Sequence, residues 1–142
     1  MKKPIQIYFL CIQNRCRSQI AEAYAKYYGG TDVNVESAGL EPINIHPLTI
    51  EVMKEVGIDL SRNISKKIDM KFFMNSNIIV KLCEQLKERC PLIPFPITSM
   101  DWNIQDPLKE TQANIEDFRR VRDEIERKVK DLLFLNPSEK KL

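Results

Sequence analysis

The stretch IQIYFLCIQNRCRS, residues 5–18, determines how the rest of the chain is interpreted. Its first half, Ile5–Leu10, is rich in β-branched and aromatic residues and predicts a buried strand. Cys11 follows that strand directly, and Arg17 lies six residues further on. A helix-forming run from Ser18 to Tyr28 comes next, with apolar residues at helical spacing. The stretch therefore predicts a strand, a loop that carries a thiol and a guanidinium, and a helix.

The alternation of strand and helix continues along the chain. Further strands are predicted at Val33–Ser37, Ile78–Leu82 and Ile97–Trp102, and further helices at Leu48–Val56, Lys71–Asn75 and Ile115–Leu135. Such alternation is typical of right-handed crossovers and a parallel sheet. We therefore expect an α/β fold in which residues 1–142 form a single domain, with a central four-stranded parallel sheet flanked by helices.

The loop after the first strand has the features of an oxyanion site. Ligands of such sheets bind outside the carboxyl ends of the strands, where both Cys11 and Cys83 fall. Loop N–H groups and a helix N-terminus attract tetrahedral anions, and Arg17 adds a bidentate clamp. Ser18 either donates its hydroxyl to the Cys11 thiolate or caps the helix. Without its context, Cys11 is equally consistent with a small buried apolar residue. The predicted binding loop comprises Ile12, Gln13, Asn14, Arg15, Cys16, Arg17 and Ser18.

Composition excludes several classes of function. The chain has 22 Lys and Arg residues against 20 Asp and Glu residues. This near balance gives no excess of positive charge that would indicate binding to nucleic acid or to an anionic membrane. No apolar run reaches the roughly 18 residues of a membrane span, and Pro4 and Gln6 interrupt the only segment that resembles a signal-peptide core. We expect a cytoplasmic monomer.

Four cysteines are present, and their spacing argues against a metal site. Cys11 and Cys16 are separated by four residues and Cys83 and Cys90 by six, whereas zinc knuckles and ribbons use two. Only His46 could supplement them, so no metal is predicted.

If Glu84–Arg89 is α-helical, Cys83 and Cys90 lie roughly 10 Å apart along the axis. A disulfide needs Cα atoms within about 7 Å, so oxidation would have to unwind this segment. The alternative is that both cysteines are inert core residues.

A family resemblance accompanies these features. Cys-x5-Arg-Ser after an N-terminal strand resembles the low-molecular-weight tyrosine phosphatase superfamily, and in particular its thioredoxin-coupled arsenate reductases. By this resemblance Cys11 is the nucleophile, Arg17 and the loop hold arsenate (with phosphate or sulfate as analogues), Ser18 tunes the thiolate and Asp106 is the general acid. Taken alone, Asp106 fits a turn or cap residue equally well. The resemblance extends nearly from end to end, through Ser37-Ala38-Gly39, Met53–Asp59, Leu82-Cys83, Cys90-Pro91, Trp102, Asp106-Pro107 and Phe118–Ile125.

The resemblance also implies a relay of thiols. Cys11 forms an arsenic adduct, Cys83 attacks Cys11 and releases arsenite, and Cys90 then attacks Cys83. The resulting Cys83–Cys90 disulfide is reduced by thioredoxin, and no tightly bound cofactor is required. Cys16 is expected to pack beneath the loop without a part in the relay.

Three positions depart from the family pattern. Gln13 stands where a glycine is usual, so a residue with a side chain is expected to adopt a glycine conformation there. Arg15 stands where a small residue is usual. Its cation either stabilises the Cys11 thiolate and attracts arsenate or points into solvent, and of the two we expect solvent. Some relatives hold potassium through residues that correspond to Asn14, Glu22 and Ser37, with an acidic residue where this chain has Lys66. Since a lysine cannot ligate potassium, its ammonium is expected to take the place of the cation beside Glu22.

Two other functions fit the same residues. One is a small phosphatase that uses Cys11, Arg17 and Asp106 on a phosphoester, although Leu108 replaces the aromatic residue that phosphotyrosine enzymes present after Asp-Pro. The other is an inactive oxyanion-binding or redox-sensing relative, which Gln13 and Arg15 suggest.

Overall fold

The predicted strand at residues 5–10 is the central element of the sheet. In the computed structural model, which describes residues 3–108 and 112–134, this strand is β1 (Ile5–Cys11). It is flanked by β2 (Val33–Gly39) and β3 (Ile78–Lys81), and β4 (Thr98–Asp101) lies outside β3. All the pairings are parallel, in the order β2-β1-β3-β4. The predicted four-stranded parallel sheet is confirmed, and the described residues form a single α/β domain.

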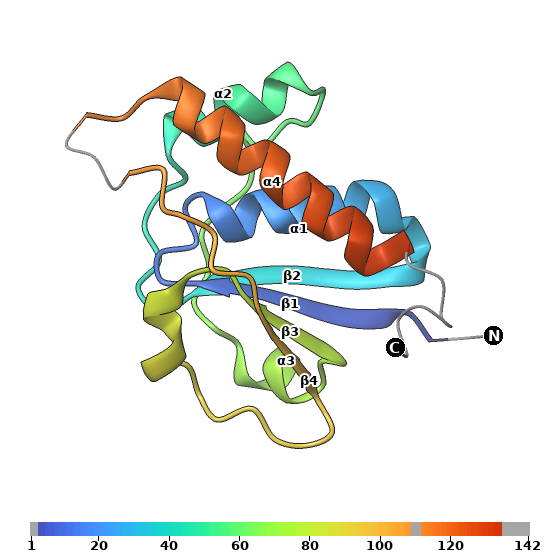
Figure 1. Ribbon diagram of the computed structural model, residues 1–142. Coiled ribbons are helices and arrows are strands. Elements are labelled where there is room, and N and C mark those ends of the chain that lie inside the picture. The colour runs from blue at the N-terminus through green and yellow to red at the C-terminus, as the bar shows by residue number, and fades with distance from the viewer. Residues whose placement is uncertain (1–2, 109–111, 135–142) are drawn as a thin grey trace.

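Helices cover both faces of this sheet (Figure 1). Helices α1 (Arg17–Gly29) and α4 (Ile115–Phe134) lie on one face with α2 (Pro47–Glu55) beside α4, and the short α3 (Met70–Met74) lies on the other. Two 3₁₀ helices, η1 (Gly30–Asp32) and η2 (Glu84–Glu88), complete the elements. Leu135, predicted as the last residue of the long helix, lies outside the described residues.

Local chemistry sets the helix boundaries. Pro47 opens α2, and the His46 ring caps it by accepting the Leu48 N–H at 3.1 Å. Asp69 caps α3 in the same way through its carboxylate. After α2, Gly57 adopts a positive φ of 85°, which lets the chain reverse at low steric cost.

Alternation along β1 builds a core on both faces. Tyr8 packs edge-on against Phe72 of α3, whereas Phe9 contacts Trp102 with ring centroids 5.7 Å apart. Trp102 therefore serves packing. With both faces covered, the carboxyl ends of β1 and β3 form the edge at which Cys11 and Cys83 emerge.

Candidate active site

The loop between Cys11 and Arg17 is held from outside by backbone hydrogen bonds. The carbonyl oxygens of Ile12, Gln13 and Arg15 accept the N–H groups of Glu41, Ile43 and His46 at 2.8, 3.1 and 3.1 Å. These bonds fix the backbone of the loop directly before the first residue of α1. A fixed loop at a helix N-terminus is a common site for a tetrahedral anion.

Gly39, at the end of β2, allows the loop to lie close to the sheet. A Cβ atom on this residue would lie 2.7 Å from the Ile12 carbonyl oxygen and 2.8 Å from the Asn14 nitrogen. These distances are shorter than any van der Waals contact. A hydrogen is therefore the only side chain that residue 39 can carry while the loop keeps its shape.

Asn14, and not Gln13, takes the left-handed conformation in this loop. The φ of Asn14 is 50°, whereas Gln13 does not have a positive φ. Asparagine tolerates the left-handed region better than most residues with a side chain. The prediction that Gln13 adopts a glycine conformation was therefore wrong, because the turn of the loop falls one residue later.

The Asn14 side chain is buried and connects the loop to its surroundings. Its Oδ1 accepts the Lys66 backbone N–H at 2.9 Å, and its Nδ2 donates to Ser18 Oγ at 2.7 Å and to Ser37 Oγ at 3.0 Å. The Ser65 hydroxyl donates to the Asn14 carbonyl at 2.8 Å. These contacts hold the left-handed residue in one conformation.

Two donors converge on the Cys11 sulfur. Ser18 Oγ lies 2.8 Å from Cys11 Sγ, and the Asn14 backbone N–H donates to the same sulfur at 3.2 Å. Because Ser18 Oγ accepts the Asn14 amide, its own proton is available for Cys11. Ser18 lies in the first turn of α1, whose N-cap is Cys16, so Ser18 does not cap the helix. Of its two expected uses, the structure supports contact with the thiol.

Arg17 and Asp106 come together at the mouth of the loop. Arg17 Nη1 donates to the Ile104 carbonyl at 2.8 Å, and its Nη2 lies 3.7 Å from Asp106 Oδ2. Asp106 Oδ1 accepts the Leu108 N–H at 2.9 Å. The Asp106 side chain is 43% exposed, against 11% for Arg17, so the carboxylate lies on the solvent side of the guanidinium. The structure thus brings the predicted acid to the predicted anion clamp.

A cavity of about 230 Å³ opens over the loop. Arg15 contributes to its wall and is half-buried, so the prediction that this side chain points into solvent was wrong. Two of the lining residues, Gln85 and Leu108, were not among the predicted site residues. Gln85 comes two residues after Cys83, and its place at the carboxyl edge of the sheet was the available signal. The cavity is lined by Cys11, Ile12, Gln13, Arg15, Cys16, Arg17, Gln85, Asp106 and Leu108.

Cys83 lies beside this site at the end of the neighbouring strand. The residue before it, Leu82, donates its N–H to the Leu10 carbonyl at 2.9 Å, which places Cys83 next to the Cys11 end of β1. Burial raises the pKa of the Cys83 thiol, and the charge of Arg17 partly opposes this shift. Cys90 is half-buried, and burial raises the pKa of its thiol as well. All four thiols are free.

The segment between Cys83 and Cys90 differs from the expected α-helix. Glu84–Glu88 forms the 3₁₀ helix η2, and the Cys90 N–H donates to the Leu86 carbonyl at 2.8 Å. A 3₁₀ helix rises about 2.0 Å per residue, so it is more extended than an α-helix of the same length. Strong helix propensity was not sufficient to predict which helix forms.

Cys16 is part of the hydrophobic core, and His46 packs beside that core. Burial raises the pKa of the Cys16 thiol to about 12, which keeps this thiol protonated at neutral pH. Burial and the positive charge of Arg15 lower the pKa of His46, whose ring lies 5.0 Å from that of Phe118. Within residues 3–108 and 112–134, no group of three or more potential metal-ligating side chains occurs.

Glu22 is the buried carboxylate behind the loop. The Ser37 hydroxyl donates to its Oε1 at 2.5 Å, and Lys26 Nζ lies 2.5 Å from its Oε2. Lys66 Nζ is 3.8 Å from Oε1, as the sequence predicted. Through Ser37 and Asn14, this carboxylate is connected to Ser18 and hence to Cys11.

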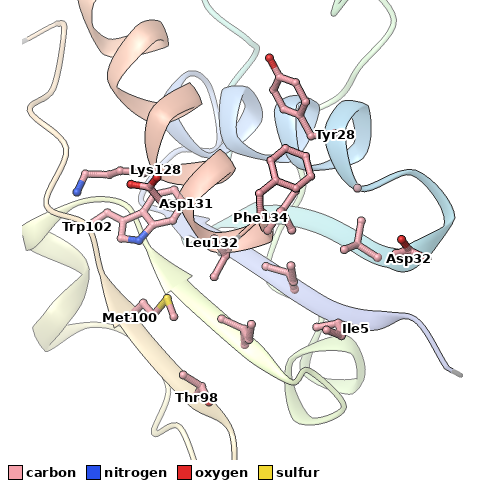
Figure 2. Close-up of a pocket in the computed structure, with 15 residues that line it drawn as sticks. Ile5, Tyr28, Asp32, Thr98, Met100, Trp102, Lys128, Asp131, Leu132 and Phe134 are labelled. Atoms are coloured by element: carbon pink, nitrogen blue, oxygen red, sulfur yellow. The ribbon is translucent and has the colours of Figure 1, made fainter. Parts of the chain in front are cut away.

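A second, larger cavity of about 720 Å³ lies away from the thiols (Figure 2). It is bordered by the C-terminal part of α4 and by the sheet, with Trp102, Met100 and Leu132 among its walls. It contains no cysteine, so we place the chemistry at the smaller cavity. None of the described helices is long and apolar enough to span a bilayer.

A family model named low molecular weight phosphotyrosine protein phosphatase matches residues 6–142. The chain belongs to this family.

Three individual proteins are similar to this chain over most of its length. Arsenate reductase 2 of Staphylococcus saprophyticus is 43% identical over 124 residues, which cover 87% of this chain and 92% of that protein. A solved structure described as an arsenate reductase in the phosphate binding state is 33% identical, with a TM-score of 0.74, over 91% of this chain and 96% of that one. A thioredoxin-dependent arsenate reductase of Corynebacterium glutamicum is 28% identical, with a TM-score of 0.75, over 93% of this chain and 62% of that one.

Proposed function

We propose that this protein is an arsenate reductase that converts arsenate to arsenite. The observation that carries this proposal is the position of a second thiol, Cys83, at the strand end next to the anion loop of Cys11. A phosphatase needs only the first thiol, whereas a two-electron reduction needs a second one to complete a disulfide. The names of the relatives support the same substrate. We take residues 1–142 as one catalytic domain.

In the first step, Arg17 and the loop N–H groups bind arsenate above Cys11. The Cys11 thiolate attacks arsenic, and an arsenic–oxygen bond breaks. Asp106 protonates the departing oxygen, which leaves as water. The hydrogen bonds from Ser18 and Asn14 hold the attacking sulfur in place.

In the second step, the Cys83 thiolate attacks the Cys11 sulfur of the adduct. A sulfur–sulfur bond forms and the sulfur–arsenic bond breaks. The electron pair of that bond remains on arsenic, which leaves as arsenite. The products are therefore arsenite and a Cys11–Cys83 disulfide, and two electrons have passed from the thiols to arsenic.

In the third step, Cys90 attacks the Cys83 sulfur and releases the Cys11 thiolate. The five residues of η2 span about 10 Å at 3₁₀ spacing, so a Cys83–Cys90 bond requires this helix to unwind. A dithiol reductant of the thioredoxin type then reduces the new disulfide. One relative is described as thioredoxin-dependent, which supports this partner. We expect the cycle to need no tightly bound cofactor and to run in the cytoplasm on a monomer.

The test is a coupled assay with arsenate, thioredoxin, thioredoxin reductase and NADPH. Wild type should consume NADPH only when arsenate is present, and Cys11→Ser and Cys83→Ser should abolish this consumption. Cys90→Ser should stop after one turnover with a Cys11–Cys83 disulfide. Ser99→Ala is the control, because Ser99 is exposed on β4 and does not line the cavity.

Other outcomes would assign a different function. Arsenate-dependent NADPH use that survives Cys83→Ser would exclude the relay. Turnover of an aryl phosphate alone would establish the phosphatase, and arsenate binding without either activity would establish an inactive oxyanion-binding or redox-sensing protein.

A further inference from the structure

Arg15 is a cation in the wall of the anion cavity that the three-step mechanism does not use. Its side chain is half-buried, and its Nε is buried without a hydrogen-bond partner in the described part of the chain. A buried N–H group without a partner carries a desolvation penalty, so the fold holds this side chain against the loop at a cost. Because Arg15 also lines the anion cavity, its guanidinium charge lies beside any anion that binds there.

The other guanidinium of the site is already engaged. Arg17 donates to the Ile104 carbonyl and lies 3.7 Å from the Asp106 carboxylate, so much of its positive charge is balanced within the protein. The substrate, in contrast, brings negative charge toward a thiolate that is also negative. A second cation is needed to offset the repulsion between these two groups.

Arg15 is well placed to supply that charge. Its backbone carbonyl is fixed by the His46 N–H at 3.1 Å, so the residue is anchored at the cavity edge. The charge of Arg15 contributes to the lowered pKa of the neighbouring His46, so that ring is uncharged at neutral pH. Gln13 and Gln85 add neutral amide groups to the same wall. Arg15 is thus the charged group on this side of the cavity.

We propose that Arg15 is a second anion-binding residue, whose guanidinium contacts the non-reacting oxygens of a bound tetrahedral dianion and raises its affinity for the loop. This inference rests on the proposed function for the identity of the substrate. The inference goes beyond that function in one respect: the arginine at position 15 strengthens the binding of the anion to the loop. Phosphate and sulfate, which have the same shape, should benefit from Arg15 in the same way.

The experiment is calorimetric titration of the reduced full-length protein with inorganic phosphate. Arg15→Met keeps much of the side-chain volume and removes the charge, and it should weaken phosphate binding by about tenfold, the loss expected for one charge-assisted hydrogen bond. Arg15→Lys should recover part of the affinity, because it restores a point charge without the guanidinium fork. Arg120→Met is the control, since Arg120 is 69% exposed on α4. Arg15→Gln allows the same comparison if methionine disturbs folding, which circular dichroism will report.

Phosphate affinity of Arg15→Met within twofold of wild type would overturn the inference, as would an equal loss in Arg120→Met. Because the titration involves no turnover, its result is independent of whether arsenate is reduced. In the coupled assay, Arg15→Met should raise the KM for arsenate in the same proportion and leave kcat nearly unchanged, since it removes binding shared by the ground state and the transition state.

Discussion

Ser18 Oγ lies 2.8 Å from Cys11 Sγ, and its position is fixed by the Asn14 amide that donates to it. A hydroxyl can point its proton in several directions, but a hydroxyl whose oxygen is already an acceptor is constrained in its choice. The Asn14 contact therefore directs the Ser18 proton to the Cys11 sulfur. The bond is preorganised before any substrate arrives.

Ser18→Ala should slow reactions of the Cys11 thiolate. A hydrogen bond to a charged group contributes about 1.5–3 kcal/mol, so we expect a loss of about tenfold or more at pH 7. Alkylation of Cys11 by iodoacetamide, followed by mass spectrometry in a Cys83→Ser/Cys90→Ser background, measures this rate. Ser99→Ala, on the exposed side of β4, is the control and should react like wild type. Equal rates in Ser18→Ala and Ser99→Ala would contradict the role of the hydroxyl.

Asp106→Asn should impair the first chemical step. The amide keeps an oxygen to accept the Leu108 N–H but has no proton to give to the leaving oxygen, so the rate should fall by about a hundredfold. Rapid-mixing measurement of arsenite release in a single turnover tests this. Asp59→Asn is a matched control, because Asp59 also accepts an N–H two residues ahead, at 2.8 Å, and lies away from the cavity. A comparable loss in both variants would indicate a structural effect.

The second step should accelerate as pH rises. Burial raises the pKa of Cys83, and only its thiolate attacks. Below that raised pKa, each pH unit increases the thiolate fraction about tenfold, so arsenite release should rise with pH across the neutral range. Cys90→Ser, which stops at the Cys11–Cys83 disulfide, isolates this step. A rate that is flat or falls between about pH 6 and 8 would mean that another event limits arsenite release.

Activity should be the same in potassium and sodium at equal ionic strength. Glu22 already has Lys26 Nζ at 2.5 Å and Lys66 Nζ at 3.8 Å, so its charge needs no metal ion. The coupled assay in the two chloride salts is the measurement, and clear stimulation by potassium would refute the prediction. Lys66→Met should cost no more than about 1 kcal/mol in the free energy of unfolding, because Lys66 is 35% exposed and Lys26 remains.

The strands and helices were predictable because their signal is local. Periodicity along β1 and α4 depends only on which side chains face the core, and the structure confirms both elements. The placement of Cys11 and Cys83 at one edge followed from the parallel topology alone.

The details of the loop were not predictable, because they depend on residues far away in the sequence. Asn14 takes its left-handed conformation against Ser37, Ser65 and Lys66, and no local pattern identifies these partners. Glu84–Glu88 is a 3₁₀ helix although its residues are good α-helix formers, and Leu86 is its one buried side chain. The sequence left Arg15 between the anion site and solvent, and the fold decides between them by placing this residue in a cavity wall.

The loop backbone lies against Gly39, so the shape of the anion loop depends on the edge strand β2. Residue 39 pairs with Cys11 in the β1–β2 register, and its missing side chain leaves the space that the loop occupies. The strand β2 contributes no reacting group, but its last residue determines which conformation the anion loop can adopt. Any design that transplants this loop into another scaffold must carry the end of β2 with it.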